Sequence, residues 1–251
     1  MHRVHLTVIG AGPAYSDVAG AVGACYLVRS GDQAIALDLG HGAFAGLARR
    51  IRPEAIASVV ISHLHPDHFV DLVPLRHYLR HHVRPSRRVR VDAPRDLGGR
   101  LDALHAEPGF TEAALDLVPL EPGSRTAGPF TIEVARVTHT DDSFAFRVSD
   151  AVAAHGLVYS GDLGVAADLR ALVRAGDTVL VEVSFGPGPV PPGAAHLDGP
   201  AVGDLANDTG AGRVLLTHLL MGRDPAATIR SVEQRFRGPV ELVAPGFETE
   251  V

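Results

Sequence analysis

Four side chains that can bind metal ions stand within six positions of one another, in the segment His63-Leu64-His65-Pro66-Asp67-His68. The segment follows an apolar run at 57–61, which predicts a buried strand. Pro66 disfavours a continuous helix through the segment, so a loop can aim several of these side chains at one point. Because neutral imidazole favours zinc, copper or iron and carboxylate adds hard-ligand character, this mixture fits zinc first and manganese or iron second.

Three further candidates, His139, Asp162 and His218, each follow a predicted strand. The segments before them are FTIEVARVT, GLVYSG and RVLLT. A single histidine at a strand end is more often a core or surface residue than a ligand. Here, however, four strand ends together present seven ligands, and this joint placement favours a shared metal centre. Seven ligands exceed what one tetrahedral zinc site can use, which favours two ions.

The elements around these residues predict a mixture of strands and helices. The expected strands are 4–9, 24–29, 34–38, 57–61, 89–91, 130–137, 144–148, 157–159, 178–181, 214–217 and 240–243. One helix is expected from the spacing of Phe44, Leu47, Ala48 and Ile51, and a second over 69–80. Hairpins mixed with βα units indicate two mixed sheets with helices outside, a four-layer αββα sandwich of the α+β class. Because the sequence shows no linker or repeat, residues 1–251 are expected to form a single domain.

The series HLHPDH, His139, Asp162 and His218 resembles the metal-binding motifs of the metallo-β-lactamase superfamily, over nearly the whole chain. The resemblance implies one ion bound by His63, His65 and His139, a second bound by Asp67, His68 and His218, and Asp162 as a bridge. Asp38 in LDLG stands where the superfamily has a structural aspartate near the site. Two cations lower the pKa of a bound water far below its value in bulk, to about 7, so the resemblance implies a hydrolase.

Several positions indicate a branch of this superfamily. Its lactamases usually have Cys where this chain has Asp162, whereas the one cysteine here is Cys25. Its diiron relatives have Glu in place of His65, and its β-CASP nucleases need a large inserted domain. The VIGAG loop, YSGD, VEVSF, AHLDG and LLTHL resemble the RNase Z-like phosphodiesterase branch instead, most closely its small bacterial cyclic-nucleotide phosphodiesterases. The chain departs from that group at 10–13, where Gly-Ala-Gly-Pro replaces Gly-Cys-Ser-Gly, and at Asp198, usually Thr or Ser.

Glu182 in VEVSF and His196 in AHLDG are, with Asp67, the candidate catalytic residues. In the resembling branch a carboxylate supports a histidine that donates a proton to the departing alkoxide, which implies these roles for Glu182 and His196. An ordinary polar pair at a loop is the alternative. The stretch Gly186–Gly193, rich in Gly and Pro, is expected to form one wall of the site mouth.

The resemblance implies hydrolysis of a small phosphodiester, such as a 3′,5′-cyclic nucleotide, by a centre that holds two Zn²⁺ ions, with Mn²⁺ or Fe²⁺ as alternatives. A carboxylic ester, lactone or thioester hydrolase with the same ligands is the main rival. An inactive metal-binding protein is less favoured, because decay ordinarily breaks the ligand set. RNA 3′-processing is disfavoured because a predicted hairpin fills the short interval between His139 and Asp162, where the bacterial processing enzymes carry an RNA-binding arm.

Composition limits the partners and the location. A net charge of −6 and a pI near 6.1 do not fit a general nucleic-acid binder, so no stable nucleic-acid partner is expected. A basic cluster could attract phosphate but more simply forms a solvated face; it consists of Arg80, Arg84, Arg87, Arg88 and Arg90 with His81 and His82. The single Cys25 excludes an intramolecular disulfide, and no apolar stretch approaches the roughly 20 residues of a membrane span. A cytoplasmic protein without a signal peptide or membrane partner is expected. A homodimer, common in the resembling branch, is left open.

Overall fold

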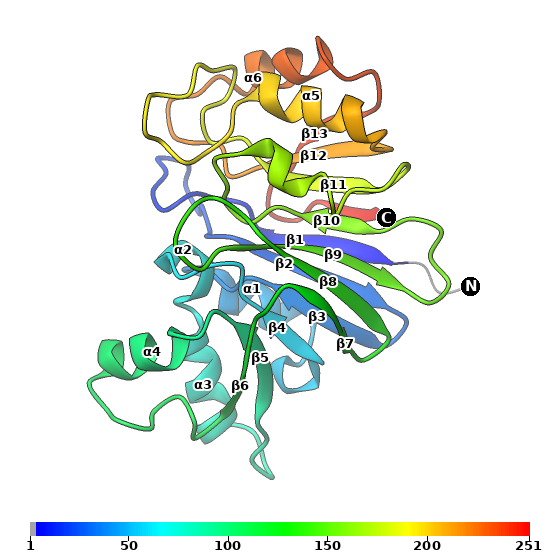
Figure 1. The fold of residues 1–251 in the computed structure, drawn as a ribbon. Coiled ribbons are helices and arrows are strands. Elements are labelled where there is room, and N and C mark those ends of the chain that lie inside the picture. The colour runs from blue at the N-terminus through cyan, green and yellow to red at the C-terminus, as the bar shows by residue number, and fades with distance from the viewer. Residues whose placement is uncertain (1–3) are drawn as a thin grey trace.

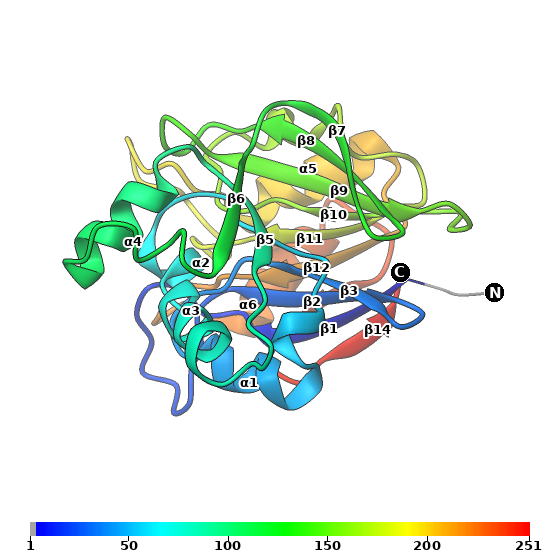
Figure 2. The same ribbon diagram turned by 90° about the horizontal axis from the view of Figure 1, so that it is seen from below.

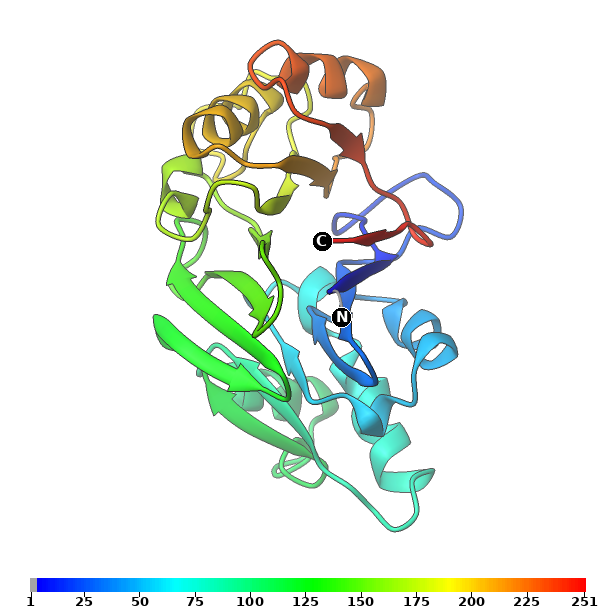
Figure 3. The ribbon, with the colours of Figure 1, turned by 90° about the vertical axis from the view of Figure 1, so that its right-hand side faces the viewer.

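Two mixed β-sheets face each other in residues 4–251, the part of the chain that the computed structural model describes (Figure 1). Helices α1 and α3 cover the outer face of the first sheet (Figure 2), and α5 and α6 pack against the second (Figure 3). One apolar core lies under the helices on each outer face, and a third lies between the sheets and contains Tyr26, Phe130 and Phe146. This arrangement confirms the expected αββα sandwich of the α+β class.

The first sheet has the strand order β14-β1-β2-β3-β4-β5-β6. Its strands are β1 (His5–Gly10), β2 (Cys25–Ser30), β3 (Gln33–Leu37), β4 (Ser58–Val60), β5 (Val89–Ala93), β6 (Leu115–Pro119) and β14 (Glu248–Glu250). Pairing is antiparallel from β14 to β3 and parallel from β3 to β6. Because parallel strands end at the same edge, the residues after β3 and β4 come together.

The second sheet repeats this plan in the order β13-β12-β11-β10-β9-β8-β7. Its strands are β7 (Gly123–Ala127), β8 (Phe130–Arg136), β9 (Phe144–Asp150), β10 (Leu157–Tyr159), β11 (Thr178–Glu182), β12 (Arg213–Thr217) and β13 (Val240–Leu242). Pairing is antiparallel from β7 to β10 and parallel from β10 to β13. The ends of β10, β11 and β12 therefore lie side by side and present the residues that follow them to one place.

The helical segments are α1 (Ala43–Arg50), η1 (Pro53–Ala55), α2 (Pro66–Phe69), α3 (Leu72–His81), α4 (Leu97–His105), η2 (Ala166–Leu169), α5 (Gly199–Thr209) and α6 (Pro225–Glu233). In α1 and α3, Leu47, Leu72 and Leu75 are buried in the apolar core on the outer face of the first sheet. Among residues 4–251, no helix is long and apolar enough to cross a membrane.

Each strand expected from the sequence has a counterpart, with small shifts at the ends. The sequence patterns missed β6, β7 and β14, all of which lie at sheet edges. Edge strands are partly solvated, and β7 and β14 are largely polar (GSRTA and ETE), so they lack the apolar run that marks a central strand. The helix expected over 69–80 is α3, which begins at Leu72, three positions later than expected, because the separate short helix α2 ends at Phe69.

Candidate functional site

The seven candidate ligands converge where strands of both sheets end. His63 and His65 follow β4, and Asp67 and His68 lie in α2, which begins at Pro66. Proline is well suited to the first helical position, since the amide it lacks would have no partner there. His139, Asp162 and His218 follow β8, β10 and β12.

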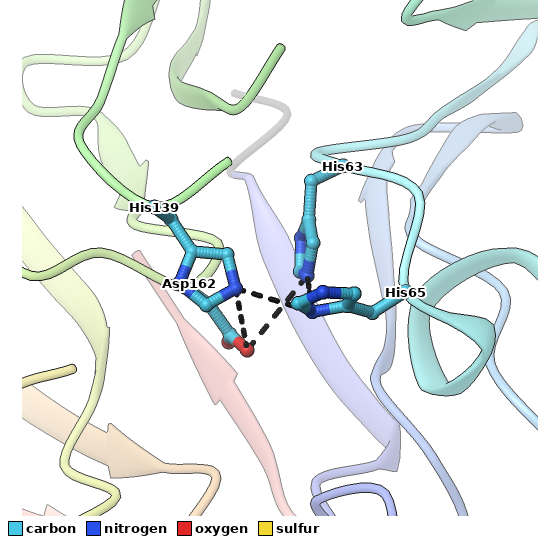
Figure 4. Close-up of side chains that lie close together, drawn as sticks. All are labelled: His63, His65, His139 and Asp162. Atoms are coloured by element: carbon cyan, nitrogen blue, oxygen red, sulfur yellow. Dashed lines mark hydrogen bonds and ion pairs between the residues drawn. The ribbon is translucent and has the colours of Figure 1, made fainter. Parts of the chain in front are cut away.

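The first cluster consists of His63, His65, His139 and Asp162 (Figure 4). His65 Nδ1 lies 3.0 Å from His63 Nε2 and 3.1 Å from His139 Nε2. Asp162 Oδ2 lies 3.8 Å from His63 Nε2 and 3.9 Å from His139 Nε2. These atoms are close enough to one another to bind a single ion.

The second cluster consists of Asp67, His68 and His218. His218 Nε2 lies 3.2 Å from Asp67 Oδ2 and 3.4 Å from His68 Nε2. Asp162 Oδ2 is 3.5 Å from Nε2 of both His68 and His218, so this one oxygen faces both clusters. Within the described residues, the other oxygen, Oδ1, is buried without a hydrogen-bond partner.

Two of these histidines have a ring nitrogen, Nδ1, that points away from the cluster, and its hydrogen bond shows whether the cluster suits a cation. His68 Nδ1 donates to Asp38 at 2.7 Å, and His139 Nδ1 donates to the carbonyl oxygen of Ala195 at 2.8 Å. Both acceptors lack a proton, so in the neutral side chains the inward Nε2 atoms carry lone pairs. Lone pairs that face one another repel unless a cation lies between them, and such outer hydrogen bonds are typical of metal-binding histidines. The residues therefore fit divalent metal ions.

Electrostatics divides the histidines into two groups. Burial, aided by the neighbouring His68, holds the pKa of His63 well below its ordinary value, and burial also lowers the pKa of His65 and His139. These three are neutral, the form that binds a metal ion. Burial opposes the charged form of His68 as well, but the carboxylates of Asp162 and Asp38 outweigh it and raise its pKa.

Asp38 lies beside the cluster, where the resemblance placed a structural aspartate. Its carboxylate accepts hydrogen bonds from the Ser62 amide at 2.6 Å, the Ser62 hydroxyl at 2.7 Å and the Tyr159 hydroxyl at 2.6 Å, in addition to His68. Its φ of 58° is a left-handed conformation that is costly for a residue other than glycine. His218 has the same φ of 58°. Both residues are thus held in strained positions by the contacts around them.

Glu182 and His196 are paired at the edge of the cluster. His196 Nδ1 donates to Glu182 Oε1 at 2.8 Å, and Glu182 also accepts the amides of Leu163 at 3.1 Å and Ser184 at 2.9 Å. Burial lowers the pKa of His196, but the hydrogen bond to Glu182 outweighs it, so the net shift is upward. His196 Nδ1 is 4.0 Å from Asp162 Oδ2. The pair is therefore placed to act on a group bound at the cluster.

The segment 185–199 forms a closed loop beside the site. The Phe185 amide donates to Leu197 at 3.0 Å, and the Gly199 amide donates to Gly186 at 2.7 Å, which joins the two ends of the loop. Gly186–Gly193 belongs to this loop, and the same loop brings Ala195 and His196 to the cluster. The Asp198 side chain accepts the Ala201 amide and caps α5. Asp, Thr and Ser are all good helix caps, so this departure from the resembling group has a local structural reason.

Sequence reasoning missed the residues that orient the ligands. Ser184 Oγ lies 3.2 Å from Nδ1 of both His196 and His218. Tyr159 acts indirectly, by donating a hydrogen bond to Asp38. Ala195 acts through its backbone oxygen, which accepts from His139. Ser62 and Tyr159 stand next to the ligand motifs in the sequence, and this proximity is the one sequence signal that could have pointed to them. No residue of the basic cluster at 80–90 belongs to the clusters of candidate ligands, and two of its arginines are paired with carboxylates: Arg88 with Asp116 and Arg90 with Asp92.

The backbone of Gly40 lies very close to the backbone of Asp67, and this contact fixes the position of α2. A Cβ added to Gly40 would lie only 1.8 Å from the carbonyl oxygen of Asp67. We expect Gly40→Ala to push α2 outward, and with it Asp67 and His68, and to weaken the binding of a divalent metal ion about 10- to 100-fold, the range found when the support of a ligand is disturbed. Competition with a chromophoric chelator measures this affinity. Gly99→Ala in α4, where nothing lies within 4 Å, is the control. Unchanged affinity in Gly40→Ala would contradict the role of this contact.

Comparison with known proteins gives a consistent result. A family model described as the beta-lactamase superfamily domain matches residues 35–219. The chain is similar to the uncharacterized protein Rv1339 of Mycobacterium tuberculosis, with 32% identity over 96% of this chain and 89% of that protein. It is also similar to the probable metallo-hydrolase YhfI of Bacillus subtilis, with 27% identity over 90% of this chain and 91% of that protein.

Solved structures share the fold over the full length. The crystal structure of YhfI, a metallo-beta-lactamase fold protein, has a TM-score of 0.88 at 24% identity and covers 99% of this chain and 100% of its own. A diphosphatase of the PhnP family has a TM-score of 0.77 at 15% identity, over 99% of this chain and 98% of its own. At these identities the likeness concerns the fold alone.

Proposed function

Because the chain belongs to the beta-lactamase superfamily and has the fold and the His/Asp cluster of a metal-dependent hydrolase, we propose that it is a phosphodiesterase of the RNase Z-like branch. The family match and the fold confirm the metallo-β-lactamase fold that the sequence motifs predicted. The proposed substrate is a small phosphodiester such as a 3′,5′-cyclic nucleotide.

The proposed ligands form two sites. His63, His65 and His139 would hold one zinc ion, Asp67, His68 and His218 would hold the second, and Asp162, whose Oδ2 faces both clusters, would serve both sites. When bound, the two cations would supply Lewis-acid activation of water and of the phosphoryl group. The chain's own contribution is to keep His63, His65 and His139 neutral by burial and to turn His68 and His139 toward the centre through Asp38 and Ala195.

The observation that carries the phosphodiesterase assignment is the Glu182–His196 pair. An alkoxide that departs from a phosphodiester is a poor leaving group and needs a proton. Glu182 holds His196 by its Nδ1 at 2.8 Å, which leaves Nε2, for which the described residues offer no hydrogen-bond partner, to donate that proton. His196 is the proposed acid, and Glu182 is the proposed positioning residue that keeps it protonated.

The interval between His139 and Asp162 supports a small substrate. It is occupied by β9, β10 and the turn between them. Arg147 in β9 makes two hydrogen bonds to the buried Asp177, at 2.7 and 2.9 Å, and so ties this hairpin to the body of the fold. The hairpin leaves no residues there for an arm that would grip an RNA.

The proposal is tested by a turnover screen of protein reconstituted with zinc or manganese. The substrates are 3′,5′-cyclic nucleotides, bis(p-nitrophenyl) phosphate, a lactone and a precursor transfer RNA with a 3′ trailer. We expect hydrolysis of the two phosphodiester classes, a nucleoside monophosphate as the cyclic-nucleotide product and two ions per chain by elemental analysis. Lactone hydrolysis without phosphodiester turnover, or site-specific trailer removal alone, would replace the proposal with the corresponding rival.

A further inference from the structure

Two buried tyrosines, Tyr26 and Tyr159, lie against each other between the sheets, and each contacts the opposite sheet. Tyr26 belongs to β2 of the first sheet and Tyr159 to β10 of the second, and their ring centroids are 4.9 Å apart. The hydroxyl of Tyr26 lies 2.6 Å from Oγ1 of Thr217, the last residue of β12. The hydroxyl of Tyr159 donates to Asp38 Oδ2 at 2.6 Å, just after β3. The two side chains thus connect the sheets in opposite directions.

The positions that the two tyrosines contact are those where the backbone is strained. Among residues 4–251, three residues other than glycine have a left-handed φ, and two of them, Asp38 and His218, lie at the candidate metal centre. A residue other than glycine keeps this conformation only where its surroundings hold it. Tyr159 contacts Asp38 itself. Tyr26 contacts Thr217, the residue directly before His218, so its hydroxyl is placed to support the other strained position.

A chain of hydrogen bonds leads from Tyr26 to the backbone of His218. The carbonyl oxygen of Ala11, directly after β1, accepts the His218 amide at 3.0 Å and the Thr217 hydroxyl at 3.4 Å. Because a carbonyl can only accept, the proton of Thr217 points to Ala11 and its lone pairs are left for the Tyr26 hydroxyl, which donates. Without that donor the buried Thr217 hydroxyl lacks a partner, and turning to find another takes it away from Ala11. The backbone at His218 then loses part of its support.

We propose that Tyr26 is a positioning residue for His218, which it holds from the opposite sheet through the Thr217 hydroxyl and the Ala11 carbonyl. His218 belongs to the second cluster of candidate ligands and not to the first. The support from Tyr26 therefore sets the affinity of one metal site and leaves the other unchanged. The inference rests on the two metal sites of the proposed function and is independent of the substrate.

The test variants are Tyr26→Phe and Thr217→Val, each of which removes one hydroxyl, and Thr217→Ser, which keeps it. The matched control is Tyr78→Phe, because Tyr78 donates to Glu54 at 2.8 Å and packs against the core on the outer face of the first sheet. The same group and the same kind of hydrogen bond are thus lost outside the centre. The first readout is the pair of stepwise Zn²⁺ affinities, from competition with a chromophoric chelator. The second is the free energy of unfolding of the metal-free protein in urea.

We expect Tyr26→Phe and Thr217→Val to weaken the binding of one of the two Zn²⁺ ions about 10- to 100-fold, the range found when the outer partner of a ligand is removed, and to leave the other unchanged. Thr217→Ser and Tyr78→Phe should bind both ions as the wild type does. If Tyr26→Phe does not fold, the two Thr217 variants test the same link.

Three results would overturn the inference. Equal weakening of both ions, or two unchanged affinities with a lower free energy of unfolding, would mean that the Tyr26 hydroxyl supports the fold in general. A loss of affinity in Thr217→Ser as large as that in Thr217→Val would mean that His218 depends on the methyl group and not on the hydroxyl.

The same measurements separate this inference from the proposed function. Zn²⁺ affinities do not depend on turnover, so a wild type that hydrolyses no phosphodiester would refute the proposed activity alone. A wild type that binds a single ion would refute the two-site centre, and the inference would then be decided by whether Tyr26→Phe weakens that ion more than Tyr78→Phe does.

Discussion

Replacement of Asp162 by alanine is expected to reduce hydrolysis about 10³- to 10⁴-fold and to remove at least one metal ion per chain. Its Oδ2 atom lies 3.5 Å from Nε2 of both His68 and His218, and 3.8 and 3.9 Å from His63 and His139. The substitution removes the ligand and the negative charge that both proposed sites share. Metal ions stabilise transition-state charge by several kcal/mol, and each factor of ten in rate corresponds to about 1.4 kcal/mol.

Initial rates with a cyclic nucleotide and elemental analysis of the same samples measure the two effects together. Asp204→Ala, an exposed position in α5, is the control and should match the wild type in both. A circular dichroism spectrum that is unchanged in Asp162→Ala would show that the loss is chemical and not a failure to fold. Full metal content with full activity in this variant would exclude Asp162 from the centre.

Replacement of His196 by alanine is expected to lower kcat for a cyclic nucleotide about 10²- to 10⁴-fold, the usual contribution of general acid catalysis, and to leave both metal ions in place. His196 faces Glu182 through Nδ1 at 2.8 Å, and its proposed role is to protonate the leaving alkoxide. The measurement is kcat together with metal content, for wild type and variant. Loss of metal in proportion to activity would instead make His196 a ligand, as its distance of 4.0 Å from Asp162 would permit.

The leaving group separates an acid from a merely structural residue. p-Nitrophenolate departs without a proton, so His196→Ala should lose far less activity on bis(p-nitrophenyl) phosphate than on the cyclic nucleotide. Glu182→Gln, which keeps the shape of the side chain but removes its charge, should show the same substrate dependence with a smaller loss. Equal losses on the two substrates would contradict the acid role of His196 and the supporting role of Glu182.

The central strands and the candidate ligands could be predicted from the sequence because their signals are local. A strand buried in a sheet needs a continuous apolar run, and β10 and β12 have one in LVY and RVLLT. The spacing within HLHPDH places four ligands in one short segment. The placement of Asp162 and His218 directly after strands, together with the resemblance to the metallo-β-lactamase motifs, was enough to expect a shared centre; the parallel pairing of β10 and β12 with β11, which brings these strand ends to one sheet edge, was not predicted.

Only the tertiary structure decided which atoms of these side chains face one another and what holds them there. Tyr159 donates to Asp38 across 121 positions of sequence, and the acceptor for His139 is the backbone oxygen of Ala195, which every residue type possesses. A backbone carbonyl or a hydroxyl group that orients a ligand has no sequence signature, because the fold and not the residue type decides whether it lies next to that ligand. A pocket lined by residues of 11–22, 218–225 and 242–245 has the same origin, because these segments follow strands of different sheets and meet only in the folded chain.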